Sequence, residues 1–284
     1  MKKIIAALTL LLPLLSAAQR STLETGTLHS EILKADKPYS VYLPAGYADS
    51  GETYPVLYLL HGASDSHTAW VEKGNMRTIA DRVIAEGMSL GMIIVMPDAS
   101  GEGADNRGKN MGYFNMEGWA YEGHFFQEFI PHIEKTYRIK ADKQHRAIAG
   151  LSMGGGGSMV YGVHHPEMFS SVCPLSGLIG EFDNSNSVQT MNQFRKSAYE
   201  NNPQDYIRKA TPQQLDALRT VRWYIDCGDD DYLAGGNVTM FLLMREKKIP
   251  LQYRMRDGAH NWLYWQQALS TVMQFCSIGF ASGK

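Results

Sequence analysis

Short apolar runs, separated by segments with apolar residues at every third or fourth position, make up most of this chain. The runs at residues 55–60 and 92–96 flank residues 75–86, which have helical spacing, and this order predicts a β-α-β unit. A second apolar helix face extends over residues 121–137. Four more buried strands are predicted at residues 146–149, 169–174, 222–227 and 251–255. Alternating strands and helices favour an α/β fold, with a mostly parallel central sheet and helices on both faces.

Three stretches depart from this alternation. Residues 22–34 and 38–44 are extended segments separated by Ala-Asp-Lys-Pro at residues 35–38, a turn-forming group, and they predict an antiparallel N-terminal hairpin. Residues 177–220 are polar and rich in Asn, Gln and Ser, and we interpret them as an insertion or cap over the end of the sheet. Residues 98–119 hold five glycines, and irregular segments of that length in compact domains are usually functional.

The start of the chain has the order of a secretory signal peptide. Two lysines precede an apolar run at residues 4–15, and small residues follow before Gln19. This run is shorter than the ~20 residues of a transmembrane helix and is interrupted by Pro13, and no other segment is long and apolar enough to span a bilayer. We therefore expect cleavage of residues 1–18, leaving residues 19–284 as a single secreted or periplasmic domain without a membrane anchor.

Charge and cysteine content exclude several classes of function. Removing Lys2 and Lys3 leaves 25 of the 27 basic residues against 29 acidic ones, a net charge of −4, so nucleic acid is a poor candidate partner. Cys173, Cys227 and Cys276 have neither the spacing of a disulfide framework nor that of a metal site, and we expect buried thiols. The sequence predicts neither a metal nor a cofactor.

The strongest chemical signal is the sequence Gly-Leu-Ser-Met-Gly at residues 150–154. It follows a predicted strand and precedes a helix-compatible segment, which is the context of a G-x-S-x-G nucleophile elbow with Ser152 at its tip. A phosphate-binding loop would need Lys-Ser/Thr after the glycines or a complete G-x-G-x-x-G, and both are missing here. A glycine turn without catalytic function remains the alternative for this pentapeptide taken alone.

A serine nucleophile needs a base and a carboxylate that orients the base. In α/β-hydrolases the chain order is serine, acid, histidine, and Asp231 and His260 fit this order, each directly after a predicted strand. Loops after parallel strands meet at the carboxyl edge of the sheet, so we expect these side chains to converge on Ser152. Asp229 and Asp230 are rivals of Asp231 for the role of the acid.

The reaction also needs two N–H donors for the oxyanion of the tetrahedral intermediate. The N–H of Met153, directly after the serine, is one candidate. The second is the N–H of Ala63, in the His-Gly-Ala-Ser segment that follows the strand at 55–60 and resembles the His-Gly motif of lipases and esterases. We interpret His61 itself as a buried residue that braces this loop.

These motifs together resemble the esterase D group of α/β-hydrolases, and carbohydrate esterase family 1 in particular. The resemblance covers residues 40–275 and rests on Tyr-Leu-Leu-His-Gly at 58–62, the helix at 126–138, Gly-Leu-Ser-Met-Gly-Gly at 150–155, Cys-Gly-Asp-Asp-Asp-Tyr-Leu at 227–233 and Gly-Ala-His-Asn-Trp at 258–262. Many relatives have Gly-Gly-His-Thr-Trp at the last position, a change that leaves the histidine in place. The resemblance implies the α/β-hydrolase fold and ester hydrolysis.

The substrate is less well indicated, because the group includes feruloyl esterases, acetyl xylan esterases, S-formylglutathione hydrolases, siderophore esterases and acyltransferases. Export favours an ester outside the cytoplasm, and the leading hypothesis is deacylation of plant polysaccharide, with release of ferulate or acetate. Trp70, Tyr113, Phe114 and Trp119 are candidates to line the acyl or sugar site, or else belong to the core. Alternatives are an acyltransferase, an esterase of siderophores or other small esters, and an inactive carbohydrate-binding homologue.

Overall fold

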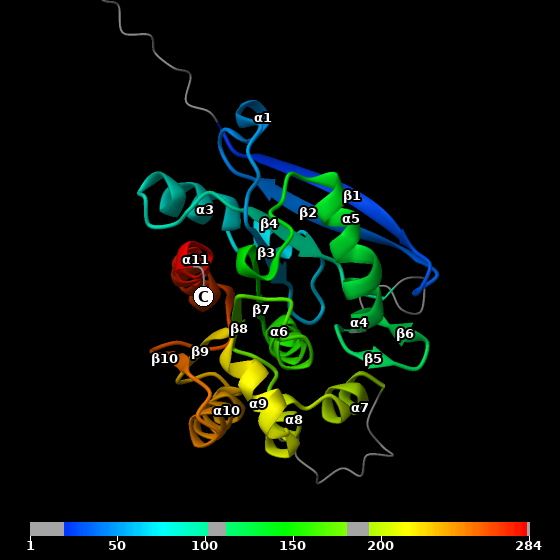
Figure 1. Ribbon diagram of the computed structural model, residues 1–284, viewed down its shortest axis with the longest axis vertical. Coiled ribbons are helices and arrows are strands. Elements are labelled where there is room, and N and C mark those ends of the chain that lie inside the picture. The colour runs from blue at the N-terminus through cyan, green and yellow to red at the C-terminus, as the bar shows by residue number, and fades with distance from the viewer. Residues whose placement is uncertain (1–19, 102–111, 181–192, 283–284) are drawn as a thin grey trace, which may run out of the picture.

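A computed structural model describes residues 20–101, 112–180 and 193–282 of this chain. The predicted signal peptide, residues 1–18, lies outside the described residues. The central feature is an eight-stranded sheet in the order β1-β2-β4-β3-β7-β8-β9-β10 (Figure 1). Its strands are β1 (Thr22–Ser30), β2 (Ala35–Leu43), β3 (Val56–Leu60), β4 (Ile93–Pro97), β7 (Arg146–Leu151), β8 (Ser171–Leu175), β9 (Arg222–Gly228) and β10 (Leu251–Arg256). A separate small ladder joins β5 (Asn115–Met116) to β6 (Trp119–Ala120).

The direction of the strands confirms the predicted α/β fold. From β4 through β3, β7, β8 and β9 to β10, every neighbouring pair is parallel. The N-terminal pair β1 and β2 is antiparallel, and β2 joins the rest of the sheet antiparallel to β4. Parallel strands place the loops that follow them at one edge of the sheet, which is where the candidate catalytic residues lie.

The hairpin turn lies four residues earlier than predicted. Residues 35–38 belong to β2, and the turn is at residues 31–34, where Lys34 adopts the left-handed region with φ 54°. The turn is held from outside the hairpin, because the Ile32 N–H donates to Glu128 Oε1 at 3.0 Å and the Ser30 hydroxyl donates to the same carboxylate at 2.5 Å. This long-range support outweighs the local turn preference of Ala-Asp-Lys-Pro.

Helices cover both faces of the sheet (Figure 1). One face packs on α3 and α11, and the other on the α4–α5 helix, α6 and α10. The helices are α1 (Tyr47–Ser50), α2 (Ala69–Glu72), α3 (Met76–Ala85), α4 (Tyr121–His124), α5 (Ile130–Thr136), α6 (Met153–His164), α7 (Gln193–Glu200), α8 (Pro203–Lys209), α9 (Pro212–Arg219), α10 (Ala234–Glu246) and α11 (Trp262–Ser282). A 3₁₀ turn at Lys143–His145 precedes β7.

The central strand β3 shows how the sequence separates these two layers. Its residues are fully buried, and they alternate between the faces of the sheet. Tyr58 and Leu60 pack in the layer of α4, α5 and α6, whereas Leu57 and Leu59 pack in the layer of α3 and α11. A strand with both faces covered is expected to be apolar throughout, as this one is.

The helix predicted at residues 121–137 is present but is not uniform. Between α4 and α5, residues Phe125–Phe129 form one turn of π-helix. Pro131, two residues after this turn, has no N–H to donate to it, which favours a local change of hydrogen-bond register. Phe125 and Phe129 are both buried and stacked against each other, with ring centroids 5.8 Å apart.

Of the segment predicted as an insertion or cap, residues 177–220, the structure describes 177–180 and the helices α7, α8 and α9. α8 packs against α6 and α10, and the Gln204 amide donates to the Gly236 carbonyl at 3.1 Å. Leu218 of α9 is buried against the start of β9. These helices therefore extend the layer of α6 and α10 along the flank of the sheet.

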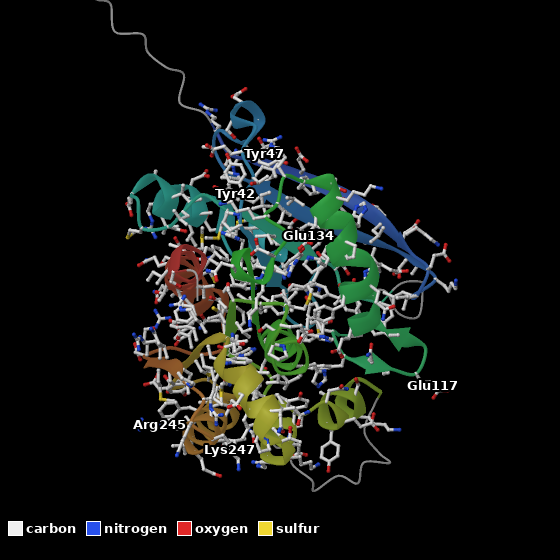
Figure 2. The ribbon with its side chains drawn as sticks, viewed as in Figure 1. Tyr42, Tyr47, Glu117, Glu134, Arg245 and Lys247 are labelled. Carbon is white, nitrogen blue, oxygen red and sulfur yellow. The ribbon has the colours of Figure 1, made fainter. Side chains whose placement is uncertain are left out.

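Side chains fill the space between the sheet and its helices, while charged residues such as Glu117, Arg245 and Lys247 lie at the periphery (Figure 2). Among the described residues, no helix has the length and apolar character needed to cross a membrane. Cys173, Cys227 and Cys276 are buried free thiols, as predicted from the sequence.

Candidate active site

The strand-turn-helix at Ser152 is the centre of the candidate site. Ser152 lies between β7 and α6 with φ 54° and ψ −115°, a conformation that costs about 1–3 kcal/mol for a residue other than glycine. The flanking positions have no room for a side chain. A Cβ on Gly150 would lie 2.4 Å from the Gly154 carbonyl oxygen, and one on Gly154 would lie 2.5 Å from the His61 carbonyl oxygen. The elbow therefore accepts only glycine at both positions.

The structure brings Ser152, His260 and Asp231 into direct contact. Ser152 Oγ lies 2.9 Å from His260 Nε2, and His260 Nδ1 lies 3.0 and 2.9 Å from the two carboxylate oxygens of Asp231. With Nδ1 donating to the carboxylate, Nε2 carries the lone pair that can accept the Ser152 proton. The three side chains therefore meet in space, with the histidine between the serine and the carboxylate, as the sequence predicts.

Asp231 is held as a carboxylate. Burial would raise its pKa, but hydrogen bonds from His260, the Leu233 N–H and Ser176 together lower the pKa below its usual value. The Leu233 N–H donates to Oδ1 at 2.8 Å. A permanently charged carboxylate stabilises the imidazolium that forms when His260 takes a proton.

The two rival carboxylates do not contact His260 and are exposed. Asp229 instead accepts hydrogen bonds from the N–H groups of Gly258 and Asp230, at 3.0 and 3.1 Å. The first of these ties the loop after β9 to the loop after β10 and so fixes the distance between Asp231 and His260. Asp229 therefore has a structural role in bringing the two loops together.

The positions of the candidate oxyanion donors follow from the same elbow. Met153 is the first residue of α6, and the first N–H groups of a helix have no acceptor within it. The loop that contains Ala63 adjoins the nucleophile, because a Cβ on the preceding Gly62 would lie 3.7 Å from Ser152 Cβ. The Met153 N–H is thus at the positive end of the α6 dipole, and the segment that carries Ala63 adjoins Ser152.

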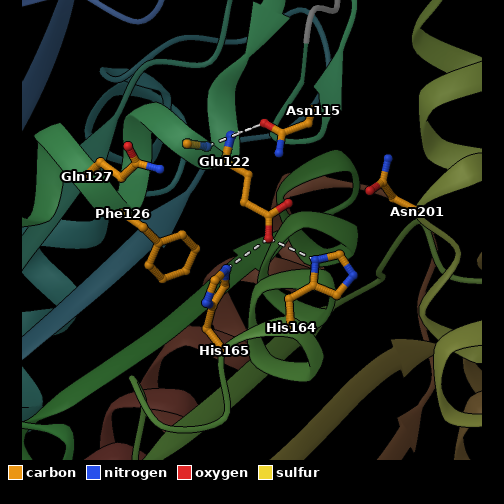
Figure 3. Close-up of a pocket in the computed structure, with 8 residues that line it drawn as sticks. Asn115, Glu122, Phe126, Gln127, His164, His165 and Asn201 are labelled. Atoms are coloured by element: carbon orange, nitrogen blue, oxygen red, sulfur yellow. Dashed lines mark hydrogen bonds and ion pairs between the residues drawn. The ribbon is translucent and has the colours of Figure 1, made fainter. Parts of the chain in front are cut away.

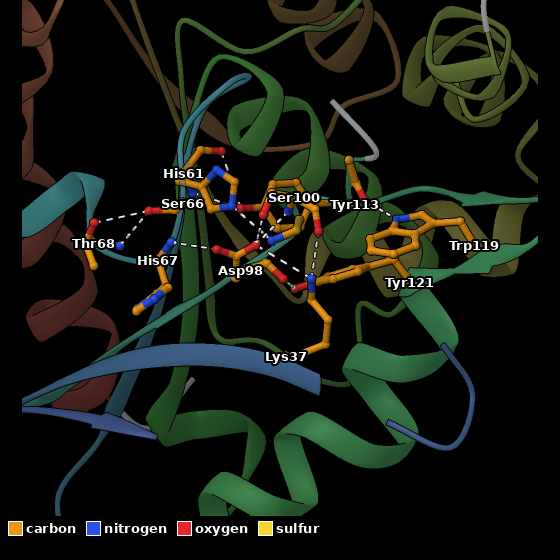
Figure 4. A network of polar contacts seen from close by, with 12 residues as sticks. Lys37, His61, Ser66, His67, Thr68, Asp98, Ser100, Tyr113, Trp119 and Tyr121 are labelled. Atoms are coloured by element: carbon orange, nitrogen blue, oxygen red, sulfur yellow. Dashed lines mark hydrogen bonds and ion pairs between the residues drawn. The ribbon is translucent and has the colours of Figure 1, made fainter. Parts of the chain in front are cut away.

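His61 braces this loop, as predicted. It is buried, its Nδ1–H donates to the Gly62 carbonyl at 2.8 Å, and Nε2 accepts the Ala99 N–H at 2.9 Å. Burial lowers the pKa of His61, which keeps the ring neutral and preserves the acceptor. The Tyr113 hydroxyl accepts the His61 N–H at 2.9 Å (Figure 4). The loop is therefore fixed to the segment that follows β4.

A buried ion pair lies beneath that brace (Figure 4). Lys37 Nζ, on β2, lies 3.6 Å from Asp98 Oδ1 and donates to the Ser100 carbonyl at 2.7 Å. Burial would raise the pKa of Asp98, but His61, Lys37 and the Ser100 hydrogen bonds lower it. Lys37 also lies over the Trp119 ring, 5.1 Å from its centroid. This network connects the N-terminal hairpin to the loop that carries Ala63.

The four aromatic candidates for the substrate site are core residues, which corrects that expectation. Trp70, Tyr113, Phe114 and Trp119 are at most 5% exposed. The Trp70 Nε1–H donates to the Leu60 carbonyl at 3.0 Å and its ring meets Trp262 edge-on. The other three belong to a segment that looks exposed in sequence but folds back on α6, where the Tyr161 hydroxyl donates to the Tyr113 carbonyl. Their side chains leave almost no surface for a ligand.

Sequence reasoning missed two residues that support the candidate triad. Ser176 follows β8 with φ 45°, is fully buried, and accepts the Trp265 Nε1–H at 3.0 Å, and it is among the groups that lower the pKa of Asp231. Trp265 presents its ring edge-on to His260, with centroids 4.9 Å apart. Ser176 could have been found by the rule that located Asp231, because it too directly follows a parallel strand. Nothing in the local sequence marks Trp265.

A buried carboxylate anchors the helix that follows the histidine. Asp226, in β9, is fully buried and accepts hydrogen bonds from Tyr224, Tyr264 and Arg256. Tyr264 lies in the first turn of α11 and Arg256 at the end of β10. The loop that carries His260 joins these two elements, so the network fixes both ends of that loop.

A polar cleft of about 480 Å³ lies at the far end of α6 (Figure 3). Glu122 Oε1 contacts His164 Nδ1 at 2.8 Å and His165 Nε2 at 3.1 Å. Burial would raise the pKa of Glu122, but the hydrogen bonds from the two histidines lower it to about 2. α6 has twelve residues, so at about 1.5 Å per residue this cleft is about 18 Å from Ser152. The candidate triad does not include it.

Comparison with known proteins decides the family. The Esterase family model matches residues 30–275. The chain belongs to the Esterase family. Over 87% of its length, this Esterase-family chain is 30% identical to an endo-1,4-β-xylanase/feruloyl esterase of Xylanibacter ruminicola, of which it covers 30%. The chain therefore spans less than a third of that relative.

Two further relatives match along nearly their whole length. A ferulic acid esterase of known structure has a TM-score of 0.84 and 40% identity, with coverage of 92% of this chain and 100% of that one. An acetyl esterase of Caldicellulosiruptor saccharolyticus is 23% identical, with coverage of 88% and 96%. Together with the sheet topology, these similarities make the chain an α/β-hydrolase of the carbohydrate-esterase type and a carboxylic ester hydrolase.

Proposed function

We propose that this protein is a secreted serine esterase that removes acyl groups, ferulate in the first place, from plant polysaccharide. The observation that carries the proposal is the chain of contacts from Ser152 Oγ through the His260 ring to Asp231, with both links at about 3 Å. In this proposal Ser152 is the nucleophile, His260 the general base and Asp231 the residue that orients the base.

Acylation starts when Ser152 Oγ attacks the ester carbonyl and its proton moves to His260 Nε2. The carbonyl oxygen becomes an oxyanion, which the N–H groups of Met153 and Ala63 stabilise by about 3 kcal/mol each, the size of measured oxyanion-hole effects. The imidazolium remains paired with the Asp231 carboxylate. It then gives its proton to the leaving sugar hydroxyl, and the acyl group stays on Ser152.

In deacylation water is the nucleophile and Ser152 Oγ is the leaving group. His260 takes a proton from water, the resulting hydroxide attacks the acyl carbonyl, and the same oxyanion donors serve the second tetrahedral intermediate. When this intermediate collapses, Ser152 Oγ leaves and receives the proton from His260. The products are a carboxylic acid and the free enzyme, and water is the only reactant besides the ester.

The choice of ferulate rests on the relatives. The 40%-identical structure is a ferulic acid esterase, and the 30%-identical protein unites a xylanase with a feruloyl esterase. A polysaccharide ester lies outside the cell, which fits the signal peptide proposed for residues 1–18. Acetate is the second candidate acyl group, because the acetyl esterase relative matches this chain over 96% of its own length.

The test is release of ferulate from methyl ferulate and feruloylated xylan, and of acetate from acetylated xylan, by residues 19–284. Ser152→Ala is the negative control and Ser270→Ala, on the exposed side of α11, is a matched serine control. We expect feruloyl substrates to be turned over with the higher kcat/KM, and activity to vanish only in Ser152→Ala. Preference for acetylated xylan would select the second candidate. Activity that persists in Ser152→Ala would refute the proposed mechanism.

A further inference from the structure

Tyr232 lies beside the proposed base and has no role in the mechanism above. It directly follows Asp231 in the turn between β9 and α10, and it is 76% exposed although Asp231 itself is buried. Its ring packs on the His260 imidazole, with centroids 4.6 Å apart and planes inclined by 47°. Trp265 meets the same imidazole edge-on but is only 5% exposed. Of these two aromatic rings, Tyr232 is therefore the one that a substrate can touch.

The turn holds the backbone of Tyr232 in place. The Asp231 N–H donates to the Gly228 carbonyl at 3.4 Å, and the Ala234 N–H donates to the Asp231 carbonyl at 2.9 Å. The Leu233 N–H donates to the Asp231 carboxylate at 2.8 Å, so this bond encloses Tyr232 between its two neighbours. The exposed ring is thus attached to the same turn that orients the base.

The proposed mechanism determines which half of the ester lies next to this ring. His260 gives its proton to the leaving oxygen, so that oxygen must come within about 3 Å of Nε2. The carbonyl oxygen points instead to the N–H groups of Met153 and Ala63, and the acyl group takes the remaining position around the carbon that Ser152 attacks. The alcohol is therefore the half of the substrate that is held against the base.

We propose that Tyr232 determines specificity for the alcohol half of the ester, as an aromatic platform on which the leaving sugar stacks. The inference rests on the proposed polysaccharide-esterase function and deepens it, because it names the contact that separates a sugar ester from a simple alkyl ester. In a sugar ester the first ring is bonded to the leaving oxygen directly or through one CH₂ group. Such a ring carries C–H groups on its faces and hydroxyls at its edges, which suits an exposed aromatic face. A methyl group on the same oxygen is too small to cover the platform.

The experiment compares two esters that share the acyl group and differ in the alcohol. They are methyl ferulate and a feruloylated xylan oligosaccharide, and kcat/KM is measured for each. Tyr232→Ala removes the ring, whereas Tyr232→Phe keeps it. Ile278→Ala is the matched control, because Ile278 is another apolar side chain that is 60% exposed, near the far end of α11 from His260.

For Tyr232→Ala we expect kcat/KM for the oligosaccharide to fall about tenfold, which is ~1.4 kcal/mol, and kcat/KM for methyl ferulate to stay within about twofold of wild type. Tyr232→Phe and Ile278→Ala should stay within about twofold on both esters. An equal fall for both esters in Tyr232→Ala would mean that the ring only positions His260, and it would overturn the inference, as would no fall for either ester. A wild-type enzyme without Ser152-dependent hydrolysis of either ester would instead overturn the proposed function itself.

Discussion

Replacing Asp231 with asparagine tests which of three adjacent carboxylates orients the base. In the structure Asp231 Oδ1 accepts the Leu233 N–H at 2.8 Å, and both carboxylate oxygens lie about 3 Å from His260 Nδ1. An asparagine must keep its oxygen on the Leu233 N–H, so its NH₂ group would face Nδ1. His260 would then carry its proton on Nε2 and could no longer accept the proton of Ser152.

The expected loss follows from this change of tautomer. The same replacement in a Ser-His-Asp triad lowers kcat about 10⁴-fold, which is ~5.4 kcal/mol at 1.36 kcal/mol per tenfold. Asp229→Asn is the matched control, because this exposed neighbour bonds to the Gly258 and Asp230 N–H groups and an asparagine oxygen can still accept from both. We expect Asp229→Asn to retain kcat within about threefold.

Steady-state hydrolysis of p-nitrophenyl acetate by the two variants measures the contrast, with thermal unfolding as the check that both are folded. Raising the pH should not rescue Asp231→Asn, because the fault lies in the position of the proton and not in the charge of the ring. Retention of more than a tenth of wild-type kcat by Asp231→Asn, combined with a loss above 100-fold in Asp229→Asn, would refute the assignment.

Three further predictions follow from burial, space and charge. Trp70→Ala removes a fully buried indole and should lower the free energy of unfolding by about 3–5 kcal/mol in a denaturant titration. The ferulate-to-acetate preference of the folded enzyme should not change, and an altered preference would place Trp70 in the substrate site. Gly154→Ala places a Cβ 2.5 Å from the His61 carbonyl oxygen and should abolish both soluble expression and activity, whereas a fully active variant would contradict the geometry of the elbow. The pKa of Glu122 is lowered from 4.5 to about 2, so this group adds stability above pH 4.5 that is lost as the pH falls towards 2. In acid unfolding, the stability difference between wild type and Glu122→Gln should therefore shrink over that range, and a constant difference would count against the ion pair.

The sequence was sufficient for the fold class and for the residues that meet at the candidate site. Alternating strands and helices predict a parallel sheet, and a parallel sheet collects the loops after its strands at one edge. Ser152 directly follows β7, and Asp231 and His260 lie three and four residues after β9 and β10, so their convergence depends mainly on topology. The tight turn at Ser152 is also readable locally, because only glycine fits on either side of it.

Features that depend on distant partners were not readable. The N-terminal turn is held by Glu128, almost a hundred residues away, and this contact outweighs the turn preference of residues 35–38. Trp119 lies in an irregular segment that looks exposed in sequence, but its ring is buried with the Lys37 ammonium over it. Ser176 and Trp265, which lie beside the candidate triad, bond to each other across 89 residues. In each case neither the periodicity nor a motif of the local sequence indicates the interaction.

The central claim is that Ser152 carries the acyl group, and rapid-quench mass spectrometry tests it most directly. The protein is mixed with excess p-nitrophenyl acetate, quenched in acid within the burst phase, digested with pepsin and mapped for acetylated peptides. The account requires acetyl on the peptide with Ser152, none in Ser152→Ala, and a rate of formation reduced by orders of magnitude in His260→Ala. An acetyl group that forms and is lost at the catalytic rate on another side chain, or turnover by Ser152→Ala, would contradict it.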